Sequence, residues 1–80
     1  MTEEPTLLAQ FLDILKTSLP EGTDRLRWLR GQHYSAARRI ARLTAAWPEP
    51  NREQQVSLNN AEVWYEACTH ALNEELAKRR

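Results

Sequence analysis

The chain has 80 residues, and its 11 Lys and Arg balance 11 Asp and Glu, so the formal net charge is zero. A chain this short supplies one small core, which predicts a single domain over residues 1–80 and disfavours a large substrate cleft. Eleven Leu and ten Ala against two Val and two Ile favour helix over sheet.

Residues 6–19 form the first predicted helix. Its apolar positions recur at helical spacing: Leu7, Leu8, Phe11, Leu12, Leu15 and Leu19, with Ile14 widening the stripe. We expect the segment from Pro20 to Gly22 to end this helix.

A second helix is predicted from Thr23 and Asp24, as cap and first acid, to about Trp47. One side of it carries Leu26, Leu29, Ala36, Ala37, Ile40, Leu43 and Trp47. Gly31 allows a kink or a break near Gln32, because glycine in a helix costs about 1 kcal/mol relative to alanine.

The third predicted helix begins at Asn51, where Gln54 completes a capping box, or at Ser57 or Asn59, and runs to about Lys78. Its apolar face carries Leu58, Ala61, Trp64, Tyr65, Cys68, Ala71, Leu72 and Leu76. Short turns between three helices predict an all-α, antiparallel three-helix bundle in which the second and third helices form a long hairpin.

Charge is segregated along the chain although it sums to zero. Residues 25–46 carry six Arg and no acid, whereas residues 47–77 carry six acids and one Arg. One interpretation pairs these arginines with Glu62, Glu66, Glu74 and Glu75 of the third helix. In a second interpretation these arginines bind an acidic protein surface. In a third they bind nucleic acid, for which a chain of near-neutral charge has weak affinity.

Two aromatic residues of the second helix, Trp28 and Tyr34, project away from the centre of its apolar stripe. Exposed Trp, Tyr and Arg side chains are typical of interface hot spots. The alternative is that the first helix covers Trp28. The candidate protein-binding surface is Arg27, Trp28, Tyr34, Arg38, Arg39 and Arg42.

The sequence predicts no catalytic, metal or cofactor site. His33 lies on the apolar side of its helix, as a packed, hydrogen-bonded histidine does. Cys68 and His70 are two residues apart and therefore on different helix faces, so they cannot hold one metal ion together. No phosphate-binding loop, carboxylate pair or nucleophile elbow is present.

Two stretches resemble the Hha/YmoA family of small nucleoid-associated regulators. Thr23 to Arg30 (TDRLRWLR) resembles that family's first helix, and Asn59 to Glu74 (NNAEVWYEACTHALNE) resembles its long helix. The resemblance implies an all-α protein that binds an H-NS-like silencing protein and alters its DNA complexes. Thr69 stands where the family has an acidic residue. In its general type alone, the chain also resembles the small helical-hairpin proteins with which phages bind and inhibit host regulators.

These observations favour a small non-enzymatic module that binds and modulates another protein. Transcription, or a host or phage factor, is the expected setting. DNA binding through the arginines and a structural role in a larger assembly are the alternatives. The wide apolar stripes also predict a homodimer through the first helix or the face from Trp64 to Leu72. No apolar run is long enough for a membrane helix, the N-terminus is acidic and Cys68 is the single cysteine, so we expect a cytoplasmic protein with no membrane partner.

Overall fold

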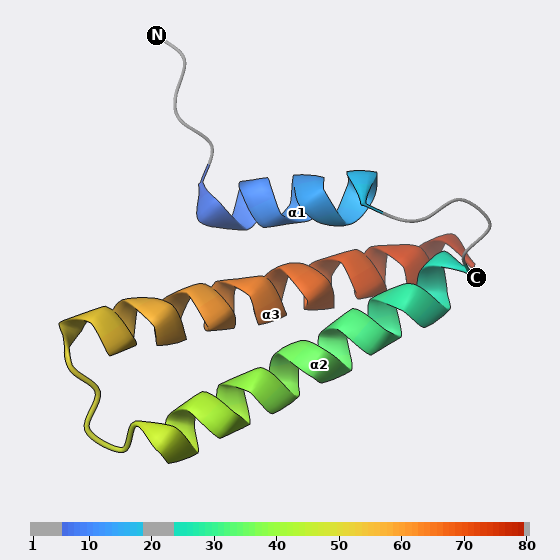
Figure 1. Cartoon of the computed structure of the whole chain (residues 1–80). Helices are drawn as coiled ribbons and strands as arrows, with labels where there is room; N and C mark the ends of the chain where they lie inside the picture. Colours follow the sequence, from blue (N-terminus) through green and yellow to red (C-terminus); the bar gives the residue numbers. More distant parts are fainter. Residues whose placement is uncertain (1–5, 19–23, 80) are drawn as a thin grey trace, which may run out of the picture.

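The computed structural model describes residues 6–18 and 24–79, and over these residues the chain is all-α (Figure 1). It contains α1 (Leu7–Thr17), α2 (Arg25–Ala46) and α3 (Arg52–Lys78), without any strand in the described part. The predicted fold class and the α2–α3 hairpin are confirmed, with α2 and α3 antiparallel and α1 lying along α3. None of these helices combines the length and apolar character required to cross a bilayer.

Each helix begins at a residue whose side chain satisfies a free backbone N–H. The Thr6 hydroxyl accepts the Ala9 N–H at 3.1 Å, and the Asp24 carboxylate accepts the Leu26 N–H at 3.0 Å. The cap of α2 is thus Asp24. The predicted roles of Leu19, of the Pro20–Gly22 segment and of Thr23 fall outside the described residues.

At the start of α3 the predicted capping box is confirmed. The Asn51 side chain accepts the Gln54 N–H at 2.8 Å, and the Gln54 side chain accepts the Asn51 N–H at 3.0 Å. The alternative starts at Ser57 and Asn59 are therefore wrong. The break considered at Gly31 is also absent, because α2 continues as regular helix through that residue.

The core lies where α1 and α2 both pack against α3. Its buried members are Leu15, Leu29, Ala67, Cys68 and Ala71, and partly buried residues packed on them are Leu8, Phe11, Leu12, Trp28, Trp64 and Leu72. Among the described residues the backbones of α1 and α2 do not approach each other closely. The third helix is therefore the centre of the molecule and has two packed sides.

Most predicted core positions are confirmed, with exceptions at the edges of the stripes. Ala37 is exposed, as are Ile14 and, marginally, Leu76. Ala67, which is not among the predicted core positions, is fully buried. It lies one turn after Trp64, on the side of α3 where the Phe11 and Trp64 rings meet edge-to-face at 5.1 Å.

Candidate protein-interaction surface

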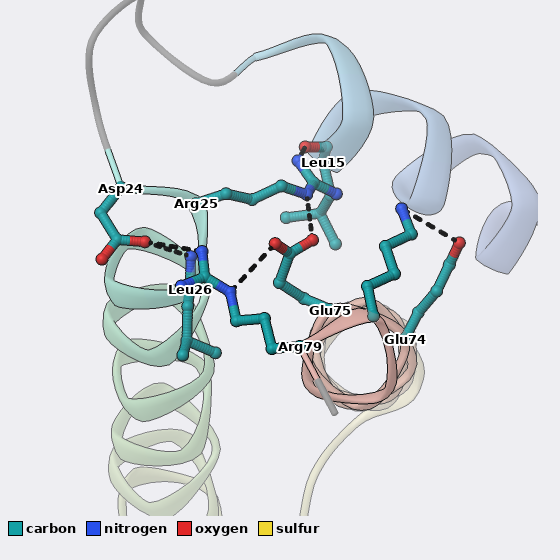
Figure 2. A network of polar contacts seen from close by, with 8 residues as sticks. Leu15, Asp24, Arg25, Leu26, Glu74, Glu75 and Arg79 are labelled. Carbon is teal, nitrogen blue, oxygen red and sulfur yellow. Dashed lines mark hydrogen bonds and ion pairs between the residues drawn. The ribbon is translucent and has the colours of Figure 1, made fainter.

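Arg25 and Arg79 belong to a network of polar contacts at one end of the bundle (Figure 2). The Glu75 carboxylate contacts Arg25 at 3.3 Å and Arg79 at 3.4 Å, and Arg79 also contacts Asp24 at 3.0 Å. Arg25 further donates a hydrogen bond of 3.2 Å to the backbone carbonyl of Leu15. The network thereby joins the C-terminal ends of α1 and α3 to the start of α2.

The remaining arginines of α2 are exposed and have no acidic partner in the described part of the chain. They are Arg27, Arg30, Arg38, Arg39 and Arg42. The interpretation that pairs the α2 arginines with the acids of α3 holds for Arg25 and Glu75 alone. Glu66 instead contacts His70 at 3.7 Å and Glu74 contacts Lys78 at 3.8 Å, both within α3.

Tyr34 occupies the middle of this arginine surface. Its side chain is 63% exposed, and the Arg38 guanidinium lies 5.8 Å from the centre of its ring. A cation over an aromatic ring at this distance is a favourable contact, worth about 0.5–1 kcal/mol at an exposed site. The pair is one helical turn apart, so it holds one arginine against the helix while both groups stay accessible.

The exposure predicted for Trp28 is wrong. Its side chain is half-buried and packs against the core cluster that contains Leu15 and Leu29. Trp28 does lie away from the centre of the apolar stripe of α2, as predicted. It is nevertheless packed, because α1 and α3 together form a wider packed region than one apolar stripe suggests. Of the six proposed surface residues, the five other than Trp28 are exposed and share α2: Arg27, Tyr34, Arg38, Arg39 and Arg42.

Beside these arginines two hollows follow one another along α2. The first, of about 260 Å³, is lined by Phe11, Ala36, Arg39, Asn60, Ala61 and Trp64. The second, more open and of about 480 Å³, is lined by Arg39, Arg42, Leu43 and Ala46. Arg39 borders both, so apolar surface and unpaired positive charge adjoin here. No signal in the sequence pattern revealed these hollows.

His33 is packed between the hairpin helices as predicted. Its Nε2 lies 3.1 Å from the Thr69 hydroxyl, and its ring stacks on Tyr65 with centres 4.6 Å apart. Since the Thr69 hydroxyl donates its one proton to the Tyr65 carbonyl at 3.0 Å, the His33 contact requires an Nε2–H donor. The histidine thus joins α2 to α3.

Cys68 and His70 lie apart, as their spacing predicted. Cys68 is fully buried, and burial raises the pKa of its thiol to about 11, whereas His70 is exposed. A thiol with so high a pKa is a poor nucleophile. No group of three or more His, Cys, Asp or Glu residues is placed to hold a metal ion over residues 6–18 and 24–79.

The fold and this surface define a small all-α protein with an arginine-rich face. No protein-family model, curated protein or solved structure matches the chain. Membership of the Hha/YmoA family therefore stays a prediction.

Proposed function

We propose that this protein is a non-enzymatic module that binds an acidic surface of another protein and modulates that protein. The contact surface consists of Arg27, Tyr34, Arg38, Arg39 and Arg42 on the outer side of α2, and Trp28 supports it from the core. Regulation of transcription, or inhibition of a host or phage factor, is the setting in which such a cytoplasmic module acts.

One observation carries the proposal: five exposed arginines of one helix have no acidic partner among the described residues. Like charges three or four residues apart, such as Arg38 and Arg42, destabilise a helix by about 0.2–0.5 kcal/mol per pair. The stability of the fold therefore does not explain why these arginines lie together on one helix. Arginine binds carboxylates through two parallel hydrogen bonds and, with tyrosine, is enriched at interface hot spots.

The experiment compares the full chain with a variant in which Arg38, Arg39 and Arg42 are replaced by Ala. Partners captured from the source cell are identified by mass spectrometry, purified, and titrated against both proteins. We expect unchanged thermal melting and an affinity at least about tenfold weaker for the variant, because truncated hot-spot residues each cost about 2 kcal/mol or more.

A second variant, in which Glu62 and Glu66 are replaced by Gln, serves as the control. Both residues are exposed on α3, and in the described part of the chain neither forms an ion pair with an arginine of α2. Equal affinity of the arginine variant and the wild type would refute the proposed surface. A large loss of melting temperature in the arginine variant would assign these arginines a structural role instead.

The same unpaired arginines favour nucleic acid as the second candidate ligand. If they bind phosphates, the affinity for duplex DNA should fall with salt at a slope of about −0.9 per neutralised phosphate on a log–log plot. We expect at most weak binding at low salt and no sequence preference. A sequence-specific complex that survives about 200 mM salt would make DNA binding the primary function.

Homodimerisation stays a separate proposal. The sequence predicts two alternative interfaces, the face from Trp64 to Leu72 and the first helix. Trp64 and Leu72 pack against the core. The proposed interface is therefore the outer side of α1, where Ile14 is 45% exposed. Light scattering of the full chain at high concentration tests it. A particle of 9.3 kDa would contradict the dimer.

A further inference from the structure

The first helix covers only part of the hairpin on which it packs. With a rise of about 1.5 Å per residue, α1 is about 16 Å long and α3 about 40 Å long. Figure 1 shows the connected end of the hairpin extending beyond the start of α1. One turn inside α1, Phe11 contacts Trp64 of α3, and the first hollow opens next to the two rings.

Small residues leave this hollow unfilled. Ala36 of α2 and Ala61 of α3 are buried and line it, while Phe11 and Trp64 provide aromatic walls. Its volume is about 260 Å³, and an apolar cavity of about 150 Å³ already accommodates a benzene ring. One large apolar side chain from outside therefore fits between the helices at this point.

The residues at the rim of the hollow indicate which polar groups the ligand carries next to that apolar side chain. Arg39 lies at the rim and Arg42 one turn further along α2, and neither has an ion-pair partner in the described part of the chain. The Asn60 side chain at the opposite rim also makes no hydrogen bond to another described residue. A ligand that carries carboxylates next to its apolar group satisfies both the hollow and the charge.

We propose that the hollow toward the connected end of the hairpin is a docking site for an acidic amphipathic segment of the partner protein. One aromatic or large aliphatic side chain of that segment enters the hollow between Phe11, Trp64 and Ala61. Two carboxylates a helical turn apart contact Arg39 and Arg42, which have the same spacing on α2. This inference rests on the proposed function and specifies the chemistry of the partner.

A set of four synthetic peptides tests the site on the full chain. The parent is a capped helical Ala/Gln peptide with one Phe and, beside it, two Glu that are one helical turn apart. The others replace Phe by Ala, both Glu by Gln, or all three. Binding is followed by the NMR signal of the Trp64 indole N–H. We expect the parent to shift this signal and to bind about tenfold or more tightly than either partly substituted peptide.

Three protein variants locate the contacts. R39Q should weaken the parent peptide about tenfold, whereas R30Q, the same charge change at an exposed arginine of α2 outside the proposed contact surface, should leave its affinity unchanged. Asn60 is exposed, so N60F fills the hollow without disturbing the packed core and should abolish the advantage of Phe over Ala. Melting curves of all three should match that of the wild type.

Each contrary result overturns the inference. No shift of the Trp64 signal would show that nothing enters the hollow. Equal binding of the Phe and Ala peptides, or equal effects of R30Q and R39Q, would show that charge alone attracts the peptide. Failure of the proposed function is distinguished with the captured partner. If the triple arginine variant loses that partner and N60F retains it, the docking site is wrong while the proposed function stands.

Discussion

Glu75 shows how a single side chain determines which arginines are paired. It is 13% exposed and contacts Arg25 and Arg79, whereas its neighbour Glu74 is 58% exposed and contacts Lys78. Adjacent residues on a helix point about 100° apart, so only one of them can face the neighbouring helices. Composition marks four glutamates of α3 as candidate partners, and only their orientation selects Glu75.

We expect Glu75→Gln to destabilise the fold by about 1–2 kcal/mol, because two arginines lose a charged acceptor in a largely buried position. Urea unfolding of the two proteins measures this difference. The matched control is Glu74→Gln, for which we expect a change of at most about 0.5 kcal/mol, since exposed ion pairs contribute little. Equal effects of the two substitutions would contradict the role given to the network.

Cys68 links stability to pH. Burial raises the pKa of its thiol to about 11, from 9.0 when unperturbed, so the folded state keeps the proton that the unfolded state loses above pH 9.0. Unfolding is therefore favoured as the pH rises, and this contribution to stability, complete below pH 9.0, is lost by about pH 11.

The measurement is the free energy of unfolding at about pH 8 and about pH 10.5 for the wild type and for Cys68→Ala. The comparison with the variant cancels every contribution that the two proteins share. We expect the wild type to lose more stability than the variant over this interval. Equal losses would show that the thiol is accessible to water in the folded protein.

At the scale of the helices, the sequence predicted most of what local chemistry determines. The cap at Asn51 and the end of α2 before Pro48 follow from rules that involve neighbouring residues only. The positions that were missed depend on a third helix. Trp28 and Ala67 flank the predicted stripes. Ala67 is buried and Trp28 half-buried because α3 packs against α1 and α2 on two different sides.

The capping box of α3 gives a prediction at this scale. Asn51→Ala removes the acceptor for the Gln54 N–H at the start of the helix on which both others pack. We expect a loss of about 0.5–2 kcal/mol, measured by urea unfolding. Asn73→Ala, at an exposed position inside the same helix, is the control, and it should be neutral or slightly stabilising because alanine favours helix. Equal losses would exclude a specific effect of the cap.

At Gly31, in contrast to Asn51, we expect a substitution by alanine to stabilise the fold. It is exposed within continuous helix, and a Cβ atom added there meets nothing within 4 Å. Gly31→Ala should therefore raise stability by about 0.5–1 kcal/mol through the smaller entropy of the unfolded chain. The reverse change at an exposed site of the same helix, Ala41→Gly, should lower it by a similar amount. A destabilising Gly31→Ala would indicate a close contact at this position.

At the scale of the whole molecule, α1 is the least supported helix. A helix of 11 residues is marginal in water by itself, so its stability comes from packing on α3 and from the Arg25 hydrogen bond to Leu15. The α2–α3 hairpin, with its longer helices, has its own contacts through Leu29 and the His33–Thr69 bond. This difference predicts that α1 can detach while the hairpin stays folded.

Native-state hydrogen exchange tests this order of opening. We expect the amides of α1 to exchange through an opening of lower free energy than those around Cys68 in α3. Phe11→Ala, which removes the ring packed on Trp64, should lower the protection of α1 much more than that of the hairpin. Ile14→Ala, a truncation at a 45% exposed position of the same helix, should have a smaller effect. If α1 exchanged only by global unfolding, the three helices would form one cooperative unit, and the aromatic wall that Phe11 gives the docking site would be permanent.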